Sequence, residues 1–409
     1  MSQPTRILLA LIAGLMLGIA GARFGWEAGL AVAEPVGGVW LDLLRMTIIP
    51  LVVALLVTGI GQTADSARGG GLAFRAVALF LVLLWISSAI GAVLTPLALD
   101  IWPMPADAAL ALKTAMGAQH ATMPPPPPMS EFLRSMVPTN AIAAAAQDRF
   151  LPLILFTTVF GVAITMLPVA QRERLTGFFD AITSAMLVMV GWVLWLAPIG
   201  VFALAFAVGI RAGTSAVGAL LHYIVIVSGV GVVVSLFAYP LAWVGGGISI
   251  GRFARAIAPS QAVAVSTQSS LASLPPMLKA TERLGLSETV AAVALPLAVA
   301  LFRVTGPVMN LAVAVYIAHW FGIPLGPKEL VAGLVVAAIT TMGAVSLPGQ
   351  VSFITSIAPI CAAMGVPVEP LALLIAVEMI PDIIRTVGNV SMDVAATAVI
   401  ARRQGKLPV

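Results

Sequence analysis

Long apolar stretches, each about the length that a helix needs to cross a lipid bilayer, recur along nearly the whole chain. They lie at 7–22, 39–60, 76–99, 150–168, 183–208 and 217–244. A spanning helix needs about 20 predominantly apolar residues, and the stretches are continuous rather than alternating, which argues against a β-barrel. With 60% of its 409 residues hydrophobic, the chain is also more apolar than an ordinary soluble domain. The sequence therefore predicts an all-α polytopic membrane protein.

The basic residues predict how these helices are oriented. If the spans alternate in direction, most arginines and lysines fall on one side, namely Arg6, Arg68, Arg75, Arg172, Arg174, Arg252, Arg255, Lys279, Arg283, Arg402, Arg403 and Lys406. Positive charges collect on the cytoplasmic side, so we expect a multi-pass protein of the inner membrane with both termini in the cytoplasm. The connection 100–140, with its proline run at 124–128, then faces outward as an extended spacer. The first helix lacks a convincing cleavage site, so we expect it to be retained.

Three interruptions set the last third of the chain apart. The segments "QSSLASLPPM" at 268–277 and "TMGAVSLPGQ" at 341–350 form a near-repeat, and "FRVTGPVMN" at 302–310 lies between them. Proline and small residues break a helix, and the freed backbone is tolerated at membrane depth only inside protein or beside water. We expect inverted repeats with two re-entrant helical hairpins and a binding site near the membrane midplane. The alternative is a set of ordinary helix kinks.

A charged stripe follows in "EMIPDIIRTVGNVSMD" at 378–393. At about 100° per residue, its five polar side chains fall within a sector of roughly 80°; they are Glu378, Asp382, Arg385, Asn389 and Asp393. Intramembrane charges of this kind cost about 3 kcal/mol or more each and usually mark function. An arginine can grip a carboxylate with two parallel hydrogen bonds, and an aspartate one turn away suits an ammonium group. The stripe therefore favours an acidic amino acid as ligand; the alternative is a buried ion-pair network that only holds helices together.

Five segments together carry a family resemblance. They are "LDLLRMTIIPLVVALLVTG", "VPTNAIAAAAQDRFLPLILFTTVFGVAITML", "TQSSLASLPPM", "GAVSLPGQ" and "DIIRTVGNVSMD". The chain resembles the dicarboxylate/amino acid:cation symporters, the glutamate transporter family, over nearly its whole length. The resemblance implies eight transmembrane helices, two re-entrant hairpins and a homotrimer. It also implies an elevator mechanism, in which residues 71–100 and 211–409 form a sliding transport domain. Residues 1–70 and 141–210 then form the scaffold, and 101–140 the extracellular loop.

The resemblance also implies roles for individual residues. Asp382 would bind the amino group of the substrate and Arg385 its side-chain carboxylate. The α-carboxylate and the flanks of the substrate would be contacted by Ser269, Ser270, Val345, Leu347, Pro348, Thr386 and Asn389. Retention of both Asp382 and Arg385 favours aspartate or glutamate over neutral amino acids and simple dicarboxylates. Gln268 stands where many prokaryotic members have arginine, which changes the charge near Asp382.

The seventh helix departs from the family pattern. Where the family carries an Asn-Met-Asp-Gly-Thr type motif for sodium, this chain reads Phe302, Arg303, Val304, Thr305 and Gly306. The position of the sodium-binding aspartate is therefore a valine, which cannot coordinate a cation. In the third helix, a tyrosine position that helps one sodium site is a leucine, Leu84, although serines remain at positions 87 and 88.

These departures suggest that Arg303 acts as a built-in cation that neutralises Asp393 or Glu378. The expected function is then secondary transport of acidic amino acids across the bilayer without sodium. Coupling would use protons through Glu378 or Asp393, or exchange of one substrate for another. The alternatives are a snorkelling Arg303 that misses the site, a sodium- or proton-coupled dicarboxylate symporter, and an anion-conducting channel.

Other chemistries find little support in the sequence. His120, His222 and His319 lie far apart in the chain and none belongs to a metal-ligand spacing, so no metal site is predicted. No Walker-type loop occurs, which argues against ATP as the driving force. An intramembrane hydrolase would need a histidine beside Ser269 or Ser270, and nothing in the sequence places one there. We expect no enzyme activity, no cofactor and no nucleic-acid partner, because the net charge of +4 chiefly reports membrane topology.

Overall fold

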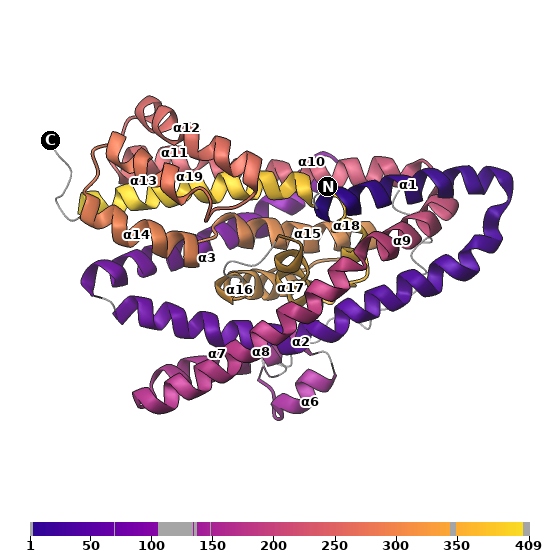
Figure 1. Ribbon diagram of the computed structural model, residues 1–409, viewed down its shortest axis with the longest axis horizontal. Helices are drawn as coiled ribbons and strands as arrows, with labels where there is room; N and C mark the ends of the chain where they lie inside the picture. Colours follow the sequence, from indigo (N-terminus) through magenta and orange to yellow (C-terminus); the bar gives the residue numbers. More distant parts are fainter. Residues whose placement is uncertain are drawn as a thin grey trace.

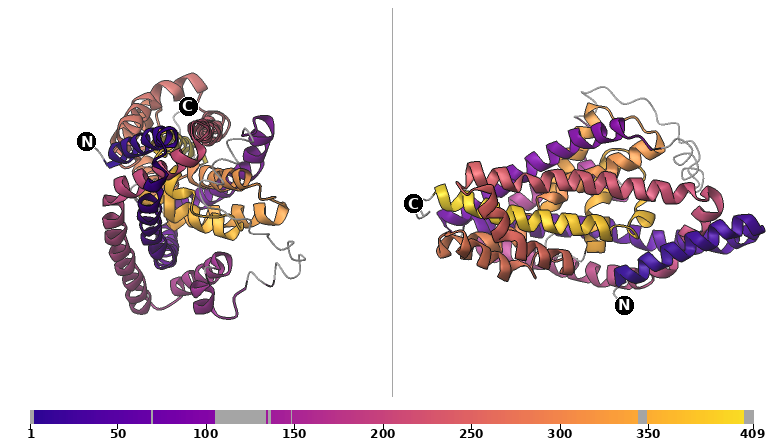
Figure 2. Two further views of the ribbon diagram at one scale, coloured as in Figure 1. Left: turned by 90° about the vertical axis from the view of Figure 1, so that its right-hand side faces the viewer. Right: turned by 90° about the horizontal axis from the view of Figure 1, so that it is seen from above.

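A computed structural model describes residues 3–68, 70–104, 134, 137–147, 149–343 and 349–403. Within these ranges the chain is helical and contains no β-strand. Most of the long helices run along the long axis of an elongated bundle, as Figure 1 and the two turned views of Figure 2 show. The Pro-rich part of the connection 100–140 lies outside the described residues.

The lengths of the helices fit a membrane protein. Over the described residues, seven segments are long and apolar enough to span a bilayer: Thr5–Phe24, Trp26–Arg68, Gly71–Ile101, Val169–Trp195, Ser215–Gly245, Glu288–Phe321 and Met379–Arg403. Three shorter apolar helices are Phe150–Thr165, Ala197–Ala212 and Ser352–Ala363. The prediction of an all-helical, multi-span chain is confirmed at this level.

The first group of helices packs around α2 (Leu30–Arg68), which runs from the right-hand end of the bundle in Figure 1 toward its lower left. It contacts α7 (Phe150–Thr165), α8 (Val169–Trp195) and α9 (Ala197–Ala212). The Trp40 indole of α2 donates a 3.0 Å hydrogen bond to a backbone carbonyl of α8. Two short elements, η1 (Trp26–Gly29) and α6 (Ala141–Ala146), accompany this group.

Glycines allow α1 (Gln3–Phe24) to lie directly against α9. A Cβ atom built at Gly209 would come within 2.7 Å of the Leu15 carbonyl oxygen and 3.0 Å of the Gly18 Cα. Small residues permit such close approach between helices in apolar surroundings. The contact therefore depends on glycine at both facing positions.

The second group contains the helices that carry the charged stripe. It comprises α3 (Gly71–Ile101), α10 (Ser215–Leu236), α14 (Glu288–Leu301), α15 (Thr305–Phe321) and α19 (Met379–Arg403). α15 packs on α3 and α10, while α19 packs on α10 and α14. α15 is buried along almost its whole length and so forms the centre of this group.

Two helical hairpins complete the bundle. α12 (Ile250–Thr267) turns back into α13 (Leu274–Arg283), and α16 (Pro327–Gly343) packs against α17 (Gly349–Ala363). The chain leaves α12 at Gln268, whose φ of 51° lies in the left-handed region. The predicted break at 268–277 is therefore present, whereas the turn of the second hairpin, 344–348, lies outside the described residues.

The third interruption is shorter than the sequence suggested. Only residues 302–304 leave the helix between α14 and α15, and the chain is helical again from Thr305. The predicted interruption is therefore present in the first three residues of 302–310, and Pro307 is accommodated in the first turn of α15, where a proline costs no internal hydrogen bond. The remaining short elements are α11 (Ala238–Pro240), η2 (Leu241–Gly245) and α18 (Leu371–Leu374).

Candidate functional site

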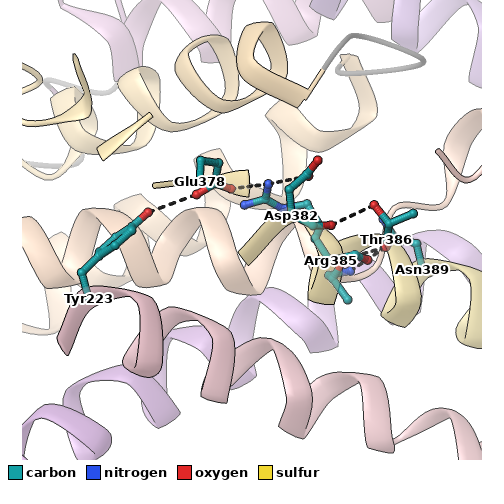
Figure 3. Close-up of polar contacts among 7 residues, drawn as sticks. Tyr223, Glu378, Asp382, Arg385, Thr386 and Asn389 are labelled. Carbon is teal, nitrogen blue, oxygen red and sulfur yellow. Dashed lines mark hydrogen bonds and ion pairs between the residues drawn. The ribbon is translucent and has the colours of Figure 1, made fainter. Parts of the chain in front are cut away.

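Three charged side chains meet at the start of α19. Nη1 of Arg385 lies 2.5 Å from Oε1 of Glu378 and 3.1 Å from Oδ1 of Asp382 (Figure 3). Glu378 sits in the turn before the helix, and Asp382 and Arg385 follow on the same side of it because residues three and four apart share a helix face. Their exposed fractions are 2%, 7% and 5%, so the network is buried. Buried ion pairs require this kind of mutual compensation.

A tyrosine from another helix joins the network. The Tyr223 hydroxyl of α10 donates a 3.2 Å hydrogen bond to Oε2 of Glu378 (Figure 3). Sequence reasoning missed this residue, because a single tyrosine in an apolar helix has no pattern to set it apart. The available signal was physical, since the hydroxyl of a buried tyrosine usually finds a hydrogen-bond partner.

Several donors of the site point to a ligand. Nε and Nη2 of Arg385 are buried and lack a hydrogen-bond partner among the described residues, as does the Nδ2 amide of Asn389. Buried donors without partners are rare in proteins because each costs free energy. The two guanidinium nitrogens belong to one planar fork, which matches the two oxygens of a carboxylate. The arrangement can therefore accept an anion while Nη1 stays paired to the protein.

Side chains of α19 hold the start of α15. Oδ1 of Asn389 accepts hydrogen bonds from the Thr305 backbone nitrogen at 3.0 Å and from the Thr305 hydroxyl at 2.8 Å. The same hydroxyl lies 2.9 Å from the Arg385 carbonyl oxygen, and the Thr386 hydroxyl donates to the Asp382 carbonyl at 2.9 Å (Figure 3). The bond to the Thr305 nitrogen satisfies a backbone group that the helix break would otherwise leave unpaired.

The other side of the break is apolar. Phe302 stacks on Phe80 of α3, with ring centroids 4.6 Å apart and planes 12° from parallel. Both rings belong to one buried hydrophobic cluster that also contains Leu84 and Val304. A hard cation such as sodium prefers several oxygen ligands. The side chains of Phe302, Leu84 and Val304 supply no such oxygen.

The two serines of α3 are engaged with backbone carbonyls. The Ser87 hydroxyl donates to the carbonyl oxygen of Val304, and the Ser88 hydroxyl donates to that of Leu334 at 2.7 Å. Among the described residues, no group of three or more His, Cys, Asp or Glu side chains is placed to hold a metal ion. Both hydroxyl hydrogens are thus donated to the protein backbone.

Arg303 lies in the break itself and is partly buried. Its guanidinium interacts electrostatically with Asp382, Asp393 and Arg385. Asp393 is fully buried, and neither of its carboxylate oxygens accepts a hydrogen bond within the described part of the chain. The charge that acts on Asp393 is that of Arg303. Of the two predicted partners of Arg303, the structure thus brings Asp393 into range, whereas Glu378 is paired with Arg385.

The hairpin residues of the predicted site stand apart from this network. Ser269 and Ser270 lie in the turn between α12 and α13. The Ser269 hydroxyl accepts a 3.2 Å hydrogen bond from the backbone nitrogen of Ala272, within the same turn. Val345, Leu347 and Pro348 lie outside the described residues.

Two of the three histidines lie within electrostatic range of each other. His222 and His319, which the sequence separates widely, interact electrostatically. α10 and α15 pack side by side and bring them together. His120 lies outside the described residues.

Comparisons with known proteins agree over the whole chain. The sequence model of the sodium:dicarboxylate symporter family matches residues 4–403. A C4-dicarboxylate transport protein of Anaeromyxobacter sp. (strain K) is 30% identical over 98% of this chain and 90% of its own length. The proton/glutamate-aspartate symporter of Escherichia coli (strain K12) is 26% identical over 99% of this chain and 93% of its own length. The proton/sodium-glutamate symport protein of Bacillus subtilis (strain 168) is 26% identical, with 98% and 92% covered.

Proposed function

Because the chain belongs to the sodium:dicarboxylate symporter family, a family of transporters rather than enzymes, we propose that it carries aspartate or glutamate across the inner membrane. The names of its relatives include both C4-dicarboxylates and acidic amino acids. The choice between these two substrate classes therefore depends on the chemistry of the site.

One observation favours acidic amino acids over C4-dicarboxylates as substrates. Within the described residues, Nε and Nη2 of Arg385 are buried donors without a hydrogen-bond partner, and the carboxylate of Asp382 lies beside the same guanidinium. An acidic amino acid complements both, because its side-chain carboxylate suits the guanidinium fork and its ammonium group suits the aspartate. A C4-dicarboxylate would set a second carboxylate against Asp382, which costs free energy in a buried site. Thr386, Asn389, Ser269, Ser270 and residues 345, 347 and 348 would complete the pocket.

We further propose that binding does not require sodium. The apolar packing of Phe302 and Val304 removes oxygen ligands from the helix break, and Arg303 supplies a fixed positive charge near Asp393. At about 4 Å and an effective dielectric constant of about 20, one such pair gives about 4 kcal/mol of attraction before desolvation. A fixed guanidinium can thus replace the electrostatic contribution of a bound ion.

The transport cycle would follow the family pattern. The chain would form a homotrimer, with residues 1–70 and 141–210 as a static scaffold and 71–100 and 211–409 as an elevator-type transport domain. Eight spanning helices and two re-entrant hairpins would place both termini in the cytoplasm. Transport would be driven by protons or by exchange of substrates.

Equilibrium binding to the purified protein tests the proposal. Aspartate, glutamate, succinate and asparagine are titrated in sodium, potassium and choline chloride at equal ionic strength. We expect aspartate or glutamate to bind best, with affinities that agree within about twofold among the salts. A rise in affinity of tenfold or more in sodium would overturn sodium independence. Tighter binding of succinate would instead establish the second candidate, a dicarboxylate symporter, which the C4-dicarboxylate relative favours.

A further inference from the structure

A buried histidine of α10 forms hydrogen bonds on both sides of its ring. His222 is 4% exposed. Its Nε2 lies 2.9 Å from the carbonyl oxygen of Trp102, and its Nδ1 lies 3.0 Å from the Tyr316 hydroxyl. That hydroxyl lies in turn 3.0 Å from the carbonyl oxygen of Ala219. The histidine therefore connects the end of α3 to α15.

The hydrogen bonds of His222 can form whether its ring is neutral or protonated. A carbonyl oxygen only accepts, so Nε2 must carry a proton in both states. When the ring is neutral, the Tyr316 hydroxyl donates to Nδ1. When the ring is protonated, Nδ1 donates to the tyrosine oxygen, and the hydroxyl turns to donate to the Ala219 carbonyl. His222 can therefore gain a proton without leaving a buried polar atom of this group unpaired, and only the tyrosine hydroxyl has to rotate.

We propose that His222 and Tyr316 form a proton-binding site that is linked to the substrate site. The inference rests on the proposed function. An imidazole ring can bind and release a proton, which suits a proton carried during transport. The link runs through Tyr223, the next residue of α10, whose ring contacts that of Tyr316 with centroids 5.3 Å apart. Tyr223 donates to Glu378, so proton binding acts on the network that holds Arg385.

The charge of the site explains why a proton is needed. With every group ionised, three carboxylates (Glu378, Asp382 and Asp393) and two guanidinium groups (Arg303 and Arg385) would carry a formal charge of −3 + 2 = −1. An acidic amino acid brings one further negative charge. Burying that charge is unfavourable unless a positive charge enters with it. A proton on His222 supplies it at a position adjacent to the network.

Other charged groups lie around His222. Asp100 of α3 and His319 of α15 are exposed, and His319 interacts electrostatically with both Asp100 and His222. From α9, Arg211 is paired with Glu34 of α2. On the side of α19, the charges are those of the network described above. His319 is thus an exposed titratable group that interacts electrostatically with His222, while the remaining charges are engaged elsewhere.

The decisive experiment compares wild-type protein with His222→Gln and the control His319→Gln. Glutamine can still donate to the Trp102 carbonyl but does not titrate. Aspartate affinity is measured from pH 5.5 to pH 8.5 in choline chloride. We expect the wild-type protein and His319→Gln to bind at least tenfold more tightly at the acidic end, and His222→Gln to vary by less than twofold. A wild-type profile in His222→Gln, or a pH-independent wild type, would overturn the proposal.

Two further measurements distinguish His222 from Glu378 as the proton carrier and test the proton site without substrate. Glu378→Gln should retain a pH-dependent affinity, and a flat profile there would identify Glu378 as the proton carrier instead. Acid–base titration of the purified, substrate-free protein should show about one proton fewer per chain in His222→Gln between pH 5 and 8. This measurement needs no substrate, so it tests the proton site even if acidic amino acids fail to bind, an outcome that would refute only the proposed function. No difference in that titration would overturn the inference.

Discussion

Two regions of the molecule differ in their chemistry. At the start of α19, buried charged side chains form ion pairs with one another. At the break between α14 and α15, apolar side chains pack together. The guanidinium of Arg385 meets Glu378 and Asp382 through Nη1, and its Nε and Nη2 have no hydrogen-bond partner in the described part of the chain. Within the same group of helices, Phe302 stacks on Phe80 in an apolar cluster. The first region can recognise an organic ion, and the second offers little to a metal ion.

The difference shows that the region at the helix break can be apolar while the neighbouring region of α19 stays charged. Asn389 connects the two regions, because its Oδ1 accepts from both the backbone and the side chain of Thr305. The break between α14 and α15 therefore keeps its shape through side-chain hydrogen bonds. Side chains of the protein thus satisfy polar groups at the start of α15.

The largest effect should come from the charged region. Arg385→Met removes the guanidinium and leaves two buried carboxylates without their partner, which costs about 3–5 kcal/mol. We expect loss of aspartate binding by a factor of about 100 to 1,000, measured by calorimetry on the purified protein. Arg385→Lys keeps a charge but loses the planar fork, so it should bind weakly even if Arg385→Met is poorly folded. Arg75→Met, at an exposed arginine of α3, serves as the control. Binding by Arg385→Met within tenfold of wild type would contradict the assignment.

A somewhat smaller effect should follow from Arg303→Met. Since Asp393 would lose the positive charge that acts on it, we expect aspartate affinity to fall about tenfold to 100-fold. The decisive feature is that the loss should be equal in sodium, potassium and choline. A loss seen only in choline would mean that sodium can still enter, and the contrast between the two regions would then be wrong.

Much of this arrangement was visible in the sequence. The apolar stretches predicted helices, and the interruptions predicted breaks between them. The interruption predicted from residue 302 onward begins where the observed break before Thr305 begins. The spacing of Asp382, Arg385 and Asn389 put them on one helix face, because helical periodicity is local. These predictions succeeded where neighbours in sequence are also neighbours in space.

The partners across helices could not be predicted. Tyr223 and Glu378 are 155 residues apart, and Ser87 and Val304 are 217 apart. Such pairs depend on the packing angle and register of helices, which a single sequence does not specify. For the same reason the choice between Asp393 and Glu378 as neighbour of Arg303 stayed open. Only the three-dimensional structure shows that Glu378 pairs with Arg385.

The contact between the two regions can be tested with Gly388→Ala. A Cβ atom at this position would come within 2.5 Å of the Thr305 Cγ2 and still closer to the Ser235 hydroxyl. Overpacking of this kind costs about 1–3 kcal/mol, so thermal unfolding should occur at a lower temperature. Gly229→Ala in α10 is the matched control, since nothing lies within 4 Å of its Cβ position. Equal unfolding temperatures for the two variants would show that α19 and α15 do not pack as tightly as the structure indicates.

The smallest effect, and the sharpest test of the second region, is expected for Ser87→Ala. The Ser87 hydroxyl donates to the carbonyl oxygen of Val304, and its removal leaves that buried oxygen without this donor, at a cost of about 1 kcal/mol. If the serine only supports the helix break, stability should fall slightly and aspartate affinity should fall about fivefold or less, by the same factor in sodium and in choline. If Ser87 and the carbonyl instead formed part of a cation site, the variant would lose affinity in sodium alone. Because the two explanations differ in the salt dependence rather than in the size of the loss, even a small effect can distinguish them.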